Sequence, residues 1–188
     1  MMIANKIKHE LTLEEFLNRS ETKPASEYFE GIIYQKPMPQ GEHSTLQMRL
    51  GTAINNVSLP PKLAYAFPEL RCTFGGRSIV PDLAVFHWSR IPRTPQGKIA
   101  NKFEISPDWI IEILSPEQSA NKVIKKILFC LKNGTELGWL IDPEDESVMI
   151  LKSNQLPEIL SESETLPVLT ILEHWQLTVK EVFDWLII

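Results

Sequence analysis

The chain has 188 residues, of which 43% are hydrophobic and 23% charged, and its formal net charge is −5. These residues are enough for one hydrophobic core, and no break in composition divides them, so we expect a single domain over residues 1–188. The acidic surplus argues against tight, sequence-independent binding of polyanions, but it does not exclude a nuclease, because divalent cations can offset the acids of an active site.

The sequence shows no signal for export or membrane insertion. The first ten residues carry lysines, but no apolar run follows them, so we predict no signal peptide. No apolar stretch approaches the roughly 20 residues that a membrane helix needs. Cys72 and Cys130 lack the spacing of metal ligands and are expected to be reduced thiols, which favours a cytoplasmic protein without a membrane partner.

The first part of the chain is predicted to contain two helices and several short strands. Thr12 and Glu15 form a capping box at the start of the first helix. Residues 28–34 are predicted to form one strand with a bulge at Gly31. The expected elements that follow are a helix at 44–57, strands at 62–67 and 70–74, and a turn at Gly75-Gly76.

Two apolar stretches each contain one acid. Asp82 interrupts a strand expected at 79–86, and Glu112 lies within a strand expected from Trp109 until Ser115-Pro116 stops it. A continuous apolar run is typical of a strand that is covered on both faces. Because burying an unpaired charge costs several kcal/mol, each carboxylate needs a partner, a proton or a metal ion.

A long segment, residues 88–107, separates these two strands. It contains three prolines and a glycine, and its basic residues outnumber its single acid, Glu104. Loops of this length are usually functional or mobile. We therefore expect a mobile arm that becomes ordered on nucleic acid, the alternative being a solvated excursion without a function.

The second half is predicted to alternate helices and strands. Ser115 and Ser119 compete as the N-cap of a helix that ends at Asn133-Gly134. Strands at 137–141 and 147–151, a polar linker at 153–167 and a short edge strand at 168–172 follow, and a second capping box at Thr178 opens a helix to about Leu186. This order predicts an α/β fold with a mixed sheet flanked by helices.

If their strands are neighbours, Asp82 and Glu112 can converge on one point. Two carboxylates and a backbone carbonyl, for which Ile113 is the natural candidate, suit Mg²⁺ or Mn²⁺. Such a metal can activate water for attack on a phosphodiester. The alternatives are glycoside hydrolysis and a pair of core acids satisfied by backbone donors or by arginine, for which Arg71 and Arg77 are the candidates. Because like charges repel, neutralising either acid is expected to leave the fold intact or more stable.

Five segments also carry a resemblance to a known family. They are Tyr28–Gly31, Glu42–Ser44, Pro81–Phe86, Ile111–Pro116 and Gly138–Pro143. Their order and spacing resemble the PD-(D/E)XK nuclease signature and, more closely, the Uma-type family of restriction-endonuclease-like proteins that is abundant in cyanobacteria. The resemblance implies a restriction-endonuclease-like fold, a divalent metal, Asp82 and Glu112 as ligands, and Glu30 as an additional acid that reaches the metal through water.

The chain departs from the nuclease signature at Leu114, where a lysine is expected. Glu112 lies about 10 Å along the strand before Ser115, a distance that a helix climbs in roughly seven residues. Counting from Ser115 gives Lys122, and counting from Ser119 gives Lys126, whereas Lys125 should point away. The usual pattern of the family places a lysine at the position of Lys126.

Two functions follow. The first is a Mg²⁺- or Mn²⁺-dependent DNA endonuclease in which Lys122 or Lys126 orients the attacking water, and Arg71, Arg77 and the basic loop contact phosphates. Cutting both strands generally needs two sites, which favours a homodimer. The alternative is a catalytically inactive module on the same fold that binds nucleic acid or protein. His43 is assigned no chemistry.

Overall fold

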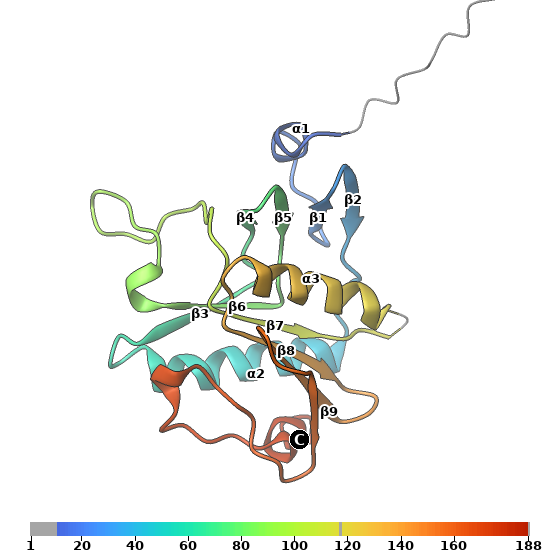
Figure 1. The fold of residues 1–188 in the computed structure, drawn as a ribbon, viewed down its shortest axis with the longest axis vertical. Helices are drawn as coiled ribbons and strands as arrows, with labels where there is room; N and C mark the ends of the chain where they lie inside the picture. Colours follow the sequence, from blue (N-terminus) through green and yellow to red (C-terminus); the bar gives the residue numbers. More distant parts are fainter. Residues whose placement is uncertain (1–10, 117, 188) are drawn as a thin grey trace, which may run out of the picture.

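The computed structural model of the protein describes residues 11–116 and 118–187, and it contains two sheets and four helices (Figure 1). In spatial order, the main sheet consists of β10 (Glu158–Ser161), β9 (Ser147–Lys152), β8 (Leu137–Asp142), β7 (Trp109–Ile113), β6 (Leu83–His87) and β3 (Ala64–Pro68). The smaller sheet consists of β2 (Ile32–Gln35), β1 (Ser26–Phe29), β5 (Arg77–Ile79) and β4 (Cys72–Phe74). The helices are α1 (Leu13–Leu17), α2 (Gly41–Ser58), α3 (Ala120–Lys132) and α4 (Val179–Asp184).

Strand β7 lies inside the main sheet. It pairs antiparallel with β6 and parallel with β8, whereas the other neighbours are antiparallel, so the sheet is mixed, as predicted. A parallel pair needs a crossover connection, and α3 provides it between β7 and β8. All five residues of β7 are buried, which confirms that this continuous apolar run is covered on both faces.

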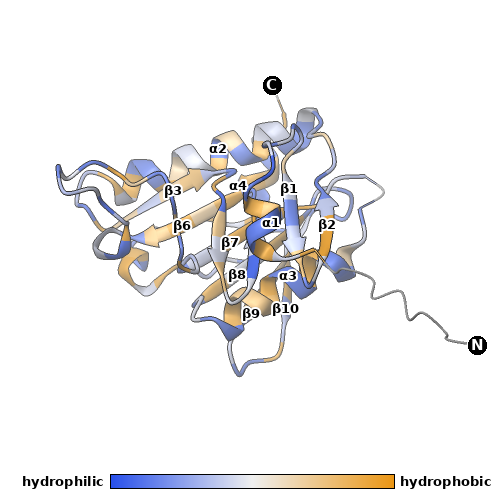
Figure 2. Ribbon diagram, turned by 90° about the horizontal axis from the view of Figure 1, so that it is seen from above, coloured by the Kyte–Doolittle hydropathy of each residue, from blue (hydrophilic) through white to orange (hydrophobic). Residues whose placement is uncertain are grey.

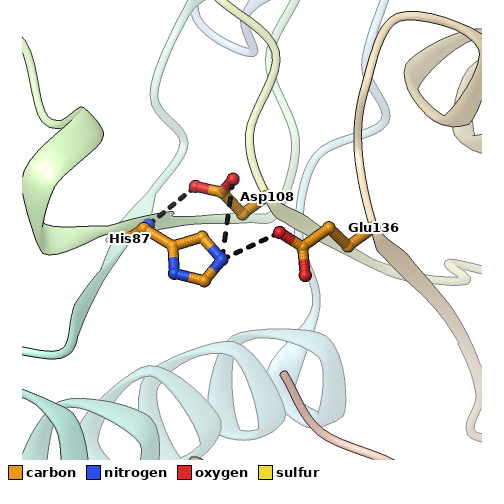
Figure 3. A group of neighbouring side chains, drawn as sticks. All are labelled: His87, Asp108 and Glu136. Carbon is orange, nitrogen blue, oxygen red and sulfur yellow. Dashed lines mark hydrogen bonds and ion pairs between the residues drawn. The ribbon is translucent and has the colours of Figure 1, made fainter. Parts of the chain in front are cut away.

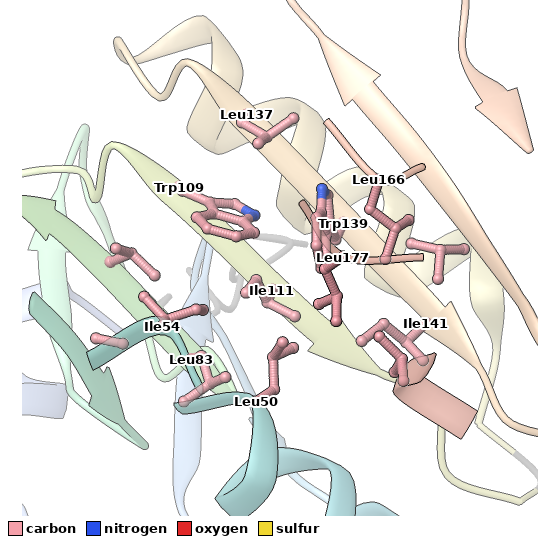
Figure 4. Close-up of a cluster of buried hydrophobic side chains, with 14 of the residues drawn as sticks. Leu50, Ile54, Leu83, Trp109, Ile111, Leu137, Trp139, Ile141, Leu166 and Leu177 are labelled. Carbon is pink, nitrogen blue, oxygen red and sulfur yellow. The ribbon is translucent and has the colours of Figure 1, made fainter. Parts of the chain in front are cut away.

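The two faces of β7 meet different helices. Trp109, Ile111 and Ile113 share a core with residues of α2 and α4, and the Trp109 ring packs against Trp139 with centroids 4.6 Å apart (Figure 4). Ile110 instead joins a second core with Ile127 of α3. Because side chains alternate along a strand, Glu112 points to the same face as Ile110, toward α3.

Helix α3 packs closely on β8. A Cβ atom at Gly138 would lie 2.3 Å from the Cγ2 atom of Ile127, a separation that real atoms do not adopt. Glycine at this position therefore lets Ile127 of the helix, the residue after Lys126, approach the strand.

Residues 28–34 form a hairpin and not one bulged strand. Glu30 and Gly31 both have positive φ angles, 48° and 84°, and they connect the paired residues Phe29 and Ile32. Two consecutive residues with positive φ are typical of a tight hairpin turn that matches the twist of its strands. The outer strand β2 is apolar but leaves Ile32 53% exposed at the edge of the smaller sheet (Figure 2).

The strand predicted at 79–86 is also divided. Strand β5 ends at Ile79 and β6 begins at Leu83, so the chain passes from the smaller sheet to the main sheet through residues 80–82. Pro81 has no N–H to donate to a ladder, which is why regular pairing stops at this point. Asp82 consequently lies just before β6 and not within a strand.

The C-terminal part differs from the sequence prediction in two places. Strand β10 forms within the predicted linker, because its backbone pairs with β9 although its side chains are mostly exposed. Residues 168–172 contain a 3-10 turn, Thr170–Leu172, and no strand. The capping boxes at Thr12 and Thr178 are both present, as predicted.

The long segment 88–107 is anchored to the body of the protein at both ends. It begins with a 3-10 turn, Trp88–Arg90, and the side chains of Ile91 and Phe103 are buried in the core on the α3 face. The carbonyl of Phe103 also accepts a hydrogen bond of 2.9 Å from the N–H of Thr73. These anchors contradict a mobile arm over the whole of residues 88–107. Within residues 93–102 the backbone is itself joined by hydrogen bonds, such as that from the N–H of Thr94 to the carbonyl of Lys98 at 2.8 Å, and mobility there stays a prediction. No helix among the described residues is long and apolar enough to span a bilayer.

Candidate active site

The structure brings Asp82 and Glu112 together. Leu83 pairs with Ile111 across β6 and β7, and one further step along this register places Asp82 opposite Glu112. The N–H of Ile113 donates a hydrogen bond of 2.8 Å to Oδ2 of Asp82. Both acids are only 2% exposed. The two carboxylates thus lie close together, as predicted, beside the start of β6 and the end of β7.

Asp82 lies among hydrogen-bond donors and positive charge. Its Oδ1 accepts from Nζ of Lys36 at 2.6 Å, and Nε2 of His43 lies 3.2 Å from Oδ2. Burial by itself raises the pKa of Asp82, but the hydrogen bond from His43 and the ammonium groups of Lys36 and Lys126 outweigh it and hold the pKa well below its usual range. This environment favours the charged form of Asp82 in the folded protein, which argues against the expectation that the fold stays intact or becomes more stable when this charge is removed.

In the part of the chain that the structure describes, Glu112 has fewer hydrogen-bond and ion-pair partners than Asp82. Its Oε2 lies 2.8 Å from Nζ of Lys126, whereas its buried Oε1 has no hydrogen-bond partner among the described residues. Burial raises the pKa of Glu112; Lys126 opposes this effect and the negative charge of Asp82 adds to it. Glu112 therefore has one oxygen available to a cation or a proton.

Lys126 supplies the ammonium group that Leu114 cannot. Helix α3 begins at Ala120 with Ser119 as its N-cap. Of the two N-caps considered in the sequence analysis, Ser119 is the one whose count of seven residues leads to Lys126. Its Nζ bridges Glu112 and Oε1 of Glu27, at 2.8 and 2.9 Å. Burial opposes the charged form of Lys126, but Glu112 and Glu27 outweigh it and raise the pKa of Lys126 above its ordinary value.

The other lysines of α3 point elsewhere. Lys122 is exposed, and its Nζ lies 5.7 Å from the centre of the Tyr34 ring. Lys125 is also exposed, as predicted. Of the two candidates from the sequence, the structure brings Lys126 to the acids and leaves Lys122 outside.

Glu27, which sequence reasoning missed, takes the place expected for Glu30. Glu27 is 7% exposed in β1, and its Oε1 accepts from the N–H of Val80 at 2.8 Å and from Lys126. Glu30 lies at the hairpin turn with a 78% exposed side chain that pairs with Arg77. The turn dipeptide Glu30-Gly31 was the available signal, because it places Glu30 outside the strand and Glu27 within it.

Arg71 and Arg77 do not neutralise the buried acids. Arg71 pairs with Glu21 and donates to Oγ of Ser78 at 2.9 Å. Arg77 pairs with Glu30 and lies 4.3 Å from the centre of the Phe129 ring. These two arginines therefore do not satisfy the core acids, whereas a backbone donor, the N–H of Ile113, does bind Asp82.

The residues around the two acids fit a hard divalent cation. A cavity of about 10 Å³ adjoins Asp82 and is lined by His43, Ile113 and Ser115 among others, which is space for roughly one water molecule. Oγ of Ser115, Nδ1 of His43 and Oε1 of Glu112 are buried without a hydrogen-bond partner among the described residues. The oxygen atoms among them, with the carboxylate of Asp82, are of the ligand type that Mg²⁺ or Mn²⁺ prefers.

A second group of ligand-type side chains, shown in Figure 3, lies at the end of β6 and just before the starts of β7 and β8. The group comprises His87, Asp108 and Glu136, whose ligand atoms lie within 4.8 Å of one another. Arg90 donates to Oδ1 of Asp108, the N–H of His87 donates to its Oδ2 at 2.7 Å, and Nε2 of His87 lies 2.9 Å from Oε1 of Glu136. These contacts satisfy the group internally, and they tie the start of the long segment to the sheet.

Comparisons with known proteins agree with the geometry. A sequence model of the family described as "Uma2: Putative restriction endonuclease" matches residues 13–180. The chain is also similar to a crystal structure described as "a putative nuclease belonging to DUF820" from Anabaena variabilis ATCC 29413. The two chains are 54% identical, with a TM-score of 0.92, over 94% of this chain and 99% of the other. No curated protein matches.

The family match spans nearly the whole chain, and the similar crystal structure has the same arrangement of mixed sheet and helices. The chain therefore has the restriction-endonuclease-like fold and belongs to the Uma2 family, whose description is "Putative restriction endonuclease".

Proposed function

We propose that this protein is a Mg²⁺- or Mn²⁺-dependent endonuclease that hydrolyses phosphodiester bonds of DNA, and that residues 1–188 form one domain. The observation that carries the proposal is the position of Lys126. Its ammonium lies 2.8 Å from Glu112, and Asp82 binds the N–H of Ile113, the residue next to Glu112. Two acids and one lysine, contributed by three separate segments, thus reproduce the chemistry of the nuclease signature despite Leu114.

Asp82, Glu112 and the carbonyl of Ile113 are the proposed metal ligands. A bound divalent cation would supply an activated water and offset charge on the phosphate. Asp82 stays ionised because its pKa is low, so it can hold a cation at any physiological pH. Glu112 would contribute the oxygen that lacks a partner in the protein.

Lys126 acts as a donor and not as a base in this proposal. Its raised pKa keeps the ammonium protonated, so it can orient the attacking water and stabilise negative charge, but it cannot accept a proton. Glu27 holds the ammonium from the side opposite Glu112, and we assign it the role of a positioning residue.

DNA is the proposed substrate because the family is described as a restriction endonuclease family and the similar crystal structure as a nuclease. The exposed basic residues of the long segment, Arg93, Lys98 and Lys102, are the proposed phosphate contacts. Cleavage of both strands calls for two sites, so we propose a homodimer, which analytical ultracentrifugation with and without a DNA duplex tests.

Plasmid nicking tests the proposed function. Supercoiled DNA incubated with the protein and Mg²⁺ or Mn²⁺ should become relaxed and then linear, whereas Asp82→Ala or added EDTA should leave it supercoiled. A wild-type protein that retards DNA on a gel but never cuts it, with either metal, would reject the nuclease and support the binding module.

A further inference from the structure

Lys36, in the connection between β2 and α2, is a charged contact of Asp82 to which the proposed function assigns no role. Its Nζ lies 2.6 Å from Oδ1 of Asp82 and 2.9 Å from the carbonyl oxygen of Val80. Its side chain is only 9% exposed. The other oxygen of Asp82 is occupied by Ile113 and His43, so Lys36 covers the oxygen that remains.

The same lysine lines the small cavity beside Asp82. Pro37 and Pro39, which follow Lys36 in the chain, also line this cavity, and so does Ile113. A cation that enters this cavity and binds Oδ1 of Asp82 therefore approaches the ammonium of Lys36 to within the distance at which like charges repel strongly in a buried site.

The charges of the site also show which acid Lys36 neutralises. Three buried carboxylates, Asp82, Glu112 and Glu27, face two buried or nearly buried ammonium groups, Lys36 and Lys126. Lys126 is shared between Glu112 and Glu27, and Lys36 contacts Asp82. Lys36 thus neutralises the acid that Lys126 does not contact directly.

We propose that Lys36 is an internal counter-ion of Asp82, which a divalent cation must displace, so that this lysine sets the metal affinity of the site. The proposal rests on the proposed function, because it takes Asp82 and Glu112 as metal ligands. It adds a residue that lowers the occupancy of the site at low metal concentration, and it assigns Lys36 a role distinct from that of Lys126.

Calorimetric titration with Mn²⁺, in the absence of DNA, tests the proposal. Lys36→Met keeps the length of the stem and removes the charge, so it should bind Mn²⁺ roughly tenfold or more tightly than the wild type, because a nearby like charge is gone. Lys36→Arg keeps the charge and should retain the affinity of the wild type. Lys125→Met, which removes an exposed charge from α3, is the matched control and should also bind like the wild type.

Circular dichroism and thermal unfolding first establish that each variant is folded, and Lys36→Gln replaces the methionine variant if that variant does not fold. Equal or weaker Mn²⁺ binding by the folded neutral variant, with a wild type that binds, would overturn the role of Lys36 and leave the nuclease proposal standing. If neither the wild type nor the neutral variant binds Mn²⁺ at millimolar concentration, the metal site and the role of Lys36 are both rejected.

Discussion

Nζ of Lys126 lies 2.8 Å from Oε2 of Glu112, although the two residues come from different elements, a helix and a buried strand. The helix packs over the strand face to which Glu112 points, so the ammonium reaches the carboxylate from above the sheet. The nuclease signature would place a lysine at the position of Leu114, directly after β7. In this protein the ammonium group beside Glu112 comes from Lys126 of α3 instead.

Replacing Lys126 by methionine should reduce DNA cleavage by about 10²- to 10³-fold, as the loss of a preorganised donor to developing charge does. It should also cost roughly 3–5 kcal/mol of stability, because two buried carboxylates lose their partner. Plasmid nicking and chemical denaturation measure the two effects. Lys122→Met, which removes the exposed lysine one turn earlier, should cleave like the wild type; equal activity of both variants would refute the assignment.

Replacing each acid of the β1–β2 hairpin by glutamine should distinguish the role of Glu27 from that of Glu30. Glu27→Gln should lower cleavage by at least about tenfold, because the ammonium of Lys126 loses the charged group that holds it in place. Glu30→Gln removes an exposed partner of Arg77 and should change neither activity nor stability measurably. If the Glu30 variant loses cleavage while the Glu27 variant keeps it, the original assignment from the sequence is restored.

The stability of the protein should depend on the ionisation of Asp82. The pKa of Asp82 is lower in the folded protein than in the unfolded chain, so its ionisation favours folding at pH values above about 4, the unfolded value. This contribution is lost as the pH falls toward the folded pKa. Asp82→Asn should therefore be less stable than the wild type at pH 7, by roughly 1–3 kcal/mol.

The difference between the two proteins should shrink when urea unfolding is repeated at pH values from 5 down to 2, because the contribution of Asp82 is lost below the unfolded pKa of about 4. A difference that stays constant over this range would show that the charge of Asp82 is not what stabilises the fold.

Both cysteines should be unreactive in the native protein. Burial raises the pKa of the Cys72 thiol to about 12, although Arg71 opposes it, and burial likewise raises the pKa of Cys130 well above its usual value. Since the thiolate is the nucleophile, a disulfide reagent at pH 8 should modify neither thiol in native protein and both in denaturant. Rapid modification without denaturant would contradict the burial of these side chains.

Limited proteolysis should cut the long segment only between residues 93 and 102. Ile91 and Phe103 are buried on either side of this stretch, and Asp108 binds Arg90 near its start. Asp108→Asn weakens that ion pair and should make cleavage faster at the N-terminal side. Mass spectrometry of the fragments locates the sites, and DNA should slow cleavage if the segment contacts phosphates; unchanged rates with DNA would reject that contact.

The sequence determined the elements that depend on local chemistry. The capping boxes at Thr12 and Thr178, the end of α3 at Asn133-Gly134 and the buried strand around Glu112 all follow from residues close together in the chain. The two isolated acids in apolar surroundings likewise indicated a site at Asp82 and Glu112. These features were predictable because their causes, caps, turns and an unpaired charge, act over a few residues.

Only the tertiary structure decided which side chains complete the site. Glu27 and Lys36 come from either end of a hairpin: Glu27 reaches Lys126 and Lys36 reaches Asp82, and both also contact the backbone of Val80, where the chain passes from the smaller sheet to the main sheet. The choice between Lys122 and Lys126 depended on the start of α3 and on its close packing over Gly138. Contacts of this kind join residues far apart in sequence, and no local pattern fixes the distances between them, because those distances follow from how the layers pack.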